Sequence, residues 1–166
     1  MLDALAVITR AISEHHAIRG HIKLAGDTVN DIEALFTLQR TQSGWSQTSI
    51  TALIEKQNQL LQTISFLEQG LKNHFAFEEE ALPPLFGELL MKAILHQHYE
   101  IGRQIETAKT TLANIKLEGT DQQELLSKRP VIQRNIDNLC RTVEEHASHE
   151  EIVLNMMKKA LEESTA

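Results

Sequence analysis

The sequence contains few of the residues that interrupt or cross-link a chain. Its 166 residues include three prolines, seven glycines and one cysteine, and aromatic residues make up only 4%. So few prolines and glycines predict long regular segments with few turns between them. The single cysteine, Cys140, excludes an intrachain disulfide and favours a cytoplasmic location. We interpret it as an inert helix residue rather than a metal ligand.

Long apolar runs and an excess of positive charge are also missing. No window approaches the length needed to span a bilayer, and the short apolar run after Asp3 lacks the basic start of a signal peptide. The formal charge of −7 argues against a nucleic-acid or anionic-membrane surface. With 42% apolar and 23% charged residues, the composition is that of an ordinary soluble protein. We therefore expect a single domain over residues 1–166.

Apolar residues recur at helical spacing through most of the chain, and no stretch shows the two-residue alternation of a strand. The four apolar stripes are Ile8, Ile12, Ile18, Ile22, Val29 and Phe36; Leu60, Ile64, Leu67 and Leu71; Met91, Ile94, Ile101, Ile105 and Leu112; and Ile132, Ile136, Leu139, Val143, Val153 and Met157. Breaks are expected at residues 41–48, 83–87 and 118–123, with Pro130 early in the last helix. This pattern predicts an all-α fold, an antiparallel up-down-up-down four-helix bundle with a metal site in its core.

The helical stripes sort the eight histidines. Four of them continue the apolar faces and are expected to point into the core: His15, His74, His98 and His146. His16 and His96 fall among small and charged residues and are expected in solvent, whereas His21 and His149 are borderline. Each inward histidine could instead be a core residue satisfied by a backbone carbonyl or a glutamate.

Two inward histidines have a glutamate four residues later, Glu78 after His74 and Glu150 after His146. Positions i and i+4 lie on one face of a helix, a turn apart, so an imidazole and a carboxylate can reach one cation. Such polar groups are costly to bury without partners. Imidazole with carboxylate suits iron, manganese or zinc.

The positions of the turns agree with this grouping. A helical hairpin that leaves a site and returns to it must turn near the midpoint between its two ligands. The midpoints fall at Gly44 and Trp45, at Glu88, and at Gln122, on or beside the three expected breaks. All six side chains can therefore share one level of the bundle.

An internal repeat points the same way. Residues 14–18 (EHHAI) resemble residues 97–101 (QHYEI), and residues 74–79 (HFAFEE) resemble residues 146–151 (HASHEE). The doubled pattern resembles the hemerythrin-like (HHE cation-binding) family, from about His15 to Leu154. That resemblance implies a non-haem centre of two iron ions bridged by carboxylates and an oxo or hydroxo group. Its metal ligands would be His15, His74, Glu78, His98, His146 and Glu150.

The resemblance implies a protein that binds dioxygen, nitric oxide or a related small species, in sensing, storage or stress protection. Oxygen-carrying hemerythrins are similar but have a histidine where Gly102 stands and an aspartate where Glu150 stands. The symmetric set is closer to the bacterial branch linked to iron-centre repair and nitric oxide or oxidative stress. The alternatives are an enzyme that reduces nitric oxide or peroxide, its electron donor unknown, and a structural metal-bound helical interaction module, for which zinc is a candidate metal.

Residues around the expected site have simpler interpretations. We expect Glu79 and Glu151 on the solvated surface, with support of the ligands as the alternative. Phe75, Phe77 and Phe86 are expected in the core, where they keep water from the metals.

Hairpin lengths predict how the chain could self-associate. Measured from the ligands, the first hairpin extends roughly 43 Å and the second roughly 32 Å, an overhang of about 10 Å. The overhang would carry Leu35, Phe36, Ile50, Leu53, Ile54 and, at its tip, Trp45. An exposed apolar patch usually marks a contact, so a homodimer through the Trp45 end is expected.

Overall fold

The chain forms four long helices in a computed structural model that describes residues 3–41, 47–115 and 122–165. The helices are α1 (Ala4–Thr41), α2 (Gln47–Ala81), α3 (Pro83–Ala113) and α4 (Gln122–Thr165). The described residues contain no strand, so the all-α class predicted from the sequence is confirmed. None of the described helices is both long and apolar enough to cross a membrane.

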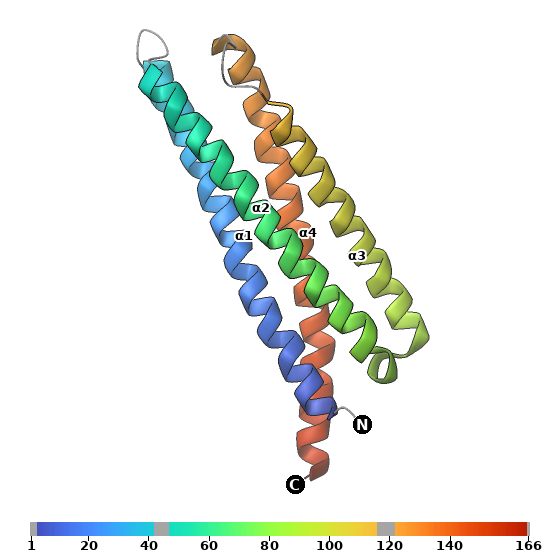
Figure 1. Ribbon diagram of the computed structural model, residues 1–166. Coiled ribbons are helices and arrows are strands. Elements are labelled where there is room, and N and C mark those ends of the chain that lie inside the picture. Colours follow the sequence, from blue (N-terminus) through green and yellow to red (C-terminus); the bar gives the residue numbers. More distant parts are fainter. Residues whose placement is uncertain (1–2, 42–46, 116–121, 166) are drawn as a thin grey trace.

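The helices lie side by side as a bundle (Figure 1). The main packing contacts join α1 to α2 and α4, and α3 to α2 and α4. Traced by colour, the chain reverses direction from each helix to the next, and the start of α1, the end of α4 and the α2–α3 connection lie toward the same end (Figure 1). Helices far apart in the sequence can therefore contribute to one level of the core.

The connection between α2 and α3 is short. Leu82 separates the two helices and is fully buried, while Pro83 and Pro84 open α3. Proline suits the first helical turn because its missing N–H would have no helical partner there. Gly87, with φ 74° and ψ 171°, then interrupts the helical backbone and kinks α3. The break predicted at residues 83–87 is thus present, as a one-residue link followed by a kink.

The other two breaks differ from the prediction at their ends, and α3 already ends at Ala113, before the predicted break at 118–123. Helix α1 continues through Thr41 and α2 begins at Gln47, so part of the expected loop at 41–48 is helical. Helix α4 already begins at Gln122, which places Pro130 inside it rather than near its start. Pro130 is exposed, so water can satisfy the carbonyl that its missing N–H leaves without a partner.

The predicted overhang is also too large. From His15 to the end of α1 is about 39 Å of helix, and from the start of α4 to His146 is about 36 Å. The predicted length of the second hairpin followed α3, which is shorter than α4. Leu53 is buried at 2% exposure, while Trp45 and the side chain of Phe36 lie outside the described residues. Self-association through the Trp45 end stays a prediction, without Leu53 as a contact.

The apolar core is divided into two clusters. The larger cluster lies toward the α1–α2 and α3–α4 connections and includes Ile18, Leu71, Ile101 and Val143. The smaller cluster lies toward the other end, and its members are Val7, Ile8, Ala11, Ala81, Leu82, Met91, Ile94 and Leu154. Of two neighbours on α4, Leu154 is fully buried in this cluster, whereas Val153, which the sequence had placed in the core, is only half-buried. A buried polar layer lies between the two clusters.

The backbone at Gly87 gives a test of the α2–α3 turn. Its dihedral angles lie in a region used almost only by glycine, where another residue costs about 1–3 kcal/mol. Gly87→Ala should lower the free energy of unfolding by about that amount, although its added Cβ would contact nothing within 4 Å. Gly20→Ala in α1, equally free of contacts, should raise it by about 0.8–1 kcal/mol. Urea unfolding measures both, and changes of the same sign would contradict the assignment.

Candidate metal centre

The polar layer brings together all six residues that the sequence had singled out. His15 comes from α1, His74 and Glu78 from α2, His98 from α3, and His146 and Glu150 from α4. All six are buried, with exposures between 0% and 6%. His16, His96 and His149 are exposed and His21 is half-buried, so the apolar stripes sorted the inward histidines correctly.

In α2 and α4 the helical repeat places one histidine and one glutamate on the same side of the helix. In α2 the imidazole Nε2 of His74 lies 2.6 Å from Oε1 of Glu78, and in α4 the corresponding distance from His146 to Glu150 is 3.7 Å. Each pair is one turn apart and points to the same side of its helix. The single histidines of α1 and α3 complete the layer between the pairs.

The six side chains form two overlapping groups. His15, His74, Glu78 and Glu150 form the first group, and Glu78, His98, His146 and Glu150 form the second. Within each group, one ligand atom from every residue lies within 4.8 Å of the others. Each group could hold a metal ion, and both groups use the same two carboxylates.

The atoms that face the interior of the layer have no hydrogen-bond partners. This holds for Nε2 of all four histidines and for both carboxylate oxygens of Glu78 and Glu150. Some of these atoms are close, for example Nε2 of His15 at 3.2 Å from Glu150 and 3.4 Å from Glu78, but without hydrogen-bond geometry. Buried polar atoms without partners are rare and costly. Imidazole nitrogens and carboxylate oxygens directed at a common space fit a transition-metal ion.

The other ring nitrogen of each histidine faces a polar side chain. Nδ1 lies 2.8 Å from Glu14 in His74, 2.9 Å from Glu79 in His98 and 2.8 Å from Gln97 in His146. In His15 it lies 3.3 Å from Glu151. The contact of His15 lacks hydrogen-bond geometry. In the other three rings a carboxylate or amide oxygen only accepts, so Nδ1 is the donor and Nε2 is left to face the interior. Metal-binding histidines are usually held in this way.

The four supporting residues follow the internal repeat. Glu14 and Gln97 each directly precede an inward histidine, and Glu79 and Glu151 each directly follow an inward glutamate. Each one supports the histidine of a neighbouring helix rather than of its own. Glu79 is exposed, as expected, and Glu151 is half-buried. Both also contact an inward histidine, which was the alternative interpretation. Their matching places in the repeat were the signal that could have identified them.

The titration behaviour reflects the crowding of charge. Burial raises the pKa of Glu150 to about 7 and lowers the pKa of His146 to about 3. Burial also opposes the charged forms of Glu78 and His15, but mutual contacts outweigh it. These contacts lower the pKa of Glu78 and raise that of His15 to about 9. Two carboxylates this close to one another need positive charge nearby to stay ionised.

Aromatic and thiol groups near the layer are not ligands. The ring of Phe75 stacks on His98 with centroids 3.7 Å apart and an interplanar angle of 12°. Phe77 and Phe86 are half-buried against the smaller apolar cluster, in line with the predicted packing role. Cys140 is half-buried, and burial raises its thiol pKa to about 11, which supports its interpretation as an inert residue.

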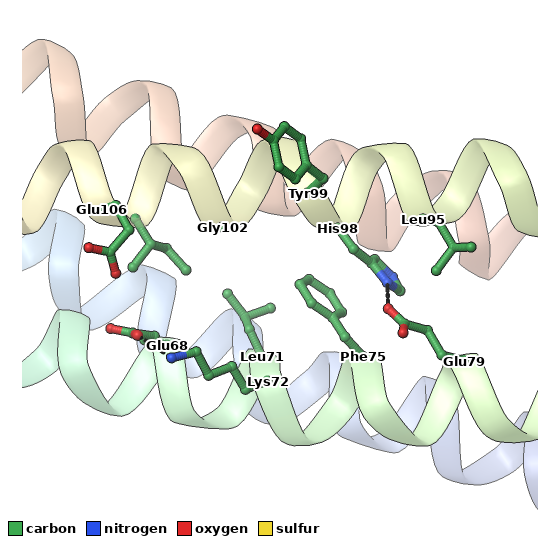
Figure 2. Close-up of a pocket in the computed structure, with 11 residues that line it drawn as sticks. Glu68, Leu71, Lys72, Phe75, Glu79, Leu95, His98, Tyr99, Gly102 and Glu106 are labelled. Carbon is green, nitrogen blue, oxygen red and sulfur yellow. Dashed lines mark hydrogen bonds and ion pairs between the residues drawn. The ribbon is translucent and has the colours of Figure 1, made fainter.

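A groove of about 470 Å³ runs between α2 and α3 beside His98 (Figure 2). Leu71, Phe75 and Leu95 form part of its apolar wall, and the Glu79–His98 hydrogen bond lies at one end. A Cβ built on Gly102 would meet nothing within 4 Å. The glycine therefore leaves the groove open beside His98.

Comparison of the chain with known protein families, with curated proteins and with solved structures gave no match. The hemerythrin-like family thus stays a prediction from the sequence. What the structure adds is the geometry of the buried layer.

The hydrogen bond from His98 to Glu79 can be tested with neighbouring glutamates. Glu79→Ala should weaken metal binding by roughly 10–100-fold, because the unsupported ring loses its fixed orientation. Glu80→Ala, one residue further along α2 and also exposed, should leave the affinity unchanged. Competition with a chelator measures both affinities. Equal affinities in the two variants would contradict a supporting role for Glu79.

Proposed function

We propose that this chain is a hemerythrin-like protein, an antiparallel up-down-up-down bundle that binds two iron ions and, through them, a small diatomic ligand such as dioxygen or nitric oxide. The observation that carries the proposal is the sharing of Glu78 and Glu150 by two four-residue groups. Carboxylates that serve two groups at once are suited to bridging two ions. Sensing, storage and stress protection are the roles this activity would serve, with iron-centre repair as a further one.

The ligand set favours iron, with manganese or zinc as the less favoured ions. Each ion would receive two imidazole nitrogens and one oxygen from each of the two glutamates, a set typical of iron and manganese sites. Four protein ligands are fewer than the six of an octahedral ion. Bound iron would supply the open coordination positions at which a small ligand binds.

The residues of the chain would orient the ligands and exclude water. Glu14, Glu79, Gln97 and Glu151 hold the four rings with Nε2 directed inward. The two apolar clusters cover the layer from both ends of the bundle. The apolar groove beside Phe75 and Gly102 offers a neutral diatomic ligand a path toward His98. This groove favours ligand binding over a purely structural metal site.

Metal content tests the proposed centre. The purified protein should bind two iron ions per chain, measured by elemental analysis after anaerobic reconstitution. Glu78→Ala and Glu150→Ala should each lose metal, because a shared ligand serves both ions. His16→Ala and His96→Ala, which change exposed histidines, should keep two ions. One ion or none in the unaltered protein would contradict the proposal.

Ligand binding tests the groove. The reduced iron-loaded protein should react with dioxygen, with a change in near-ultraviolet absorption, and should bind nitric oxide. Gly102→Leu fills open space, so it should slow nitric oxide binding in stopped-flow mixing and leave the metal content unchanged. Because leucine favours helix over glycine, it should also raise the free energy of unfolding by about 0.5–1 kcal/mol. A binding rate equal to that of Gly102→Ala would argue against this path.

A further inference from the structure

The four side chains that face the outer nitrogens of the inward histidines have different surroundings on the outside of the bundle. On the α1/α2 side, Arg10 donates to Glu14 at 2.8 Å and its guanidinium lies 3.8 Å over the ring of Phe77. On the α4/α1 side, Arg19 binds both Glu151 and Glu144. On two sides an arginine thus already occupies the supporting carboxylate, so a cation that entered there would have to displace it from its ion pairs.

The α2/α3 side is also a poor route for an ion. Its groove is walled largely by apolar side chains, among them Leu71, Phe75 and Leu95. Its carboxylates are already paired, Glu68 with Lys72 and Lys109, Glu106 with Lys109, and Glu79 with His98. A divalent ion would have to displace these partners while it loses favourable hydration along the apolar wall. This groove suits a neutral molecule.

The α3/α4 side differs from the other three. A pocket of about 210 Å³ lies there, and Gln97 and His146, joined by a hydrogen bond, are among the residues that line it. The remaining lining residues are His96, Glu100, Thr142, Glu145 and His149. His96 with Glu100, and Glu145 with His149, are spaced four residues apart on facing helices. Each helix thus presents one imidazole and one carboxylate to the same pocket. Glu100 is paired with the exposed Arg103 and with Gln104.

The internal repeat supplies a comparison within the same chain. Shifted by the repeat, the positions of His96, Glu100, Glu145 and His149 correspond to Ser13, Ala17, Asn73 and Phe77. None of these four offers an imidazole or a carboxylate. The pocket residues are therefore not a by-product of the repeat that built the buried layer.

The support beneath this pocket is neutral. Nδ1 forms a hydrogen bond in three of the inward histidines, to a carboxylate in His74 and His98 and to the amide oxygen of Gln97 in His146. Hydrogen bonds to charged groups are roughly twice as strong as those between neutral groups. The ring of His146 can therefore be released at a lower cost than the rings of His74 and His98.

We propose that divalent metal ions reach the buried centre through the α3/α4 pocket. His96, Glu145 and His149 would capture the hydrated ion, and His146 would pass it inward after releasing Gln97. This inference rests on the proposed two-metal centre, and it concerns the rate of loading rather than the final complex.

The test is the rate of metal uptake by the metal-free protein. Anaerobic stopped-flow mixing with cobalt(II), followed by its visible absorption, reports binding without any turnover. The double variant His96→Ala/His149→Ala should take up the ion more slowly, by on the order of tenfold, and still reach two ions per chain. The matched control His16→Ala/His21→Ala removes two histidines on α1 and should load at the unaltered rate.

Charge reversal provides a second measurement. Glu145→Lys should slow uptake further at low ionic strength, and added salt should reduce the difference because exposed charges are screened. Unaltered rates in both pocket variants would overturn the route and leave the centre intact. A final content below two ions in the double variant would overturn it too, since its residues would then be ligands. Failure of the unaltered protein to bind cobalt at all would overturn the proposed centre itself.

Discussion

Glu78 and Glu150 place two carboxylates in one buried layer, and the repulsion between them must be balanced by positive charge. Removing a carboxylate from water costs several kcal/mol even after relaxation. The imidazole of His15, whose pKa is raised to about 9, balances only part of this charge. Cations shared between the carboxylates would balance both groups. The layer also divides the apolar core into two clusters, so packing of the four helices at this level depends on what the carboxylates bind.

The residues inside the layer follow the internal repeat, whereas the residues outside it do not. The inner ligands follow the repeat closely, because both carboxylates must face both groups. The supports follow it with one exception, Gln97 in place of a glutamate. Outside them the repeat is lost, and each side of the bundle has its own character: Arg10, Arg19, an apolar groove and a pocket with two histidines. Under the proposed function, one centre would receive ions and neutral ligands from different directions.

The sequence was sufficient for the inward residues and insufficient for their neighbours. His15 and His98 could be found because one helical period relates them to the apolar stripe. The partners of their outer nitrogens depend on the rotation of adjacent helices, which apolar spacing fixes only to within about one residue. The start of α4 at Gln122, eight residues before Pro130, was missed because local proline preferences are weaker than the packing of a long helix. The groove at Gly102 depends on the space between two helices, which no single-helix pattern encodes.

The division of ligands between the two hairpins bears on how such a chain could arise. Each group takes three of its residues from one hairpin and a single glutamate from the other. A separate half-length chain would lack one ligand, but two identical copies would complete both groups around a two-fold axis. The bundle therefore has the symmetry of a fused homodimer, the product expected from gene duplication. Joined halves need not keep identical outer surfaces, and the α1/α2 and α3/α4 sides differ, with Arg10 on one and the pocket of His96 and His149 on the other.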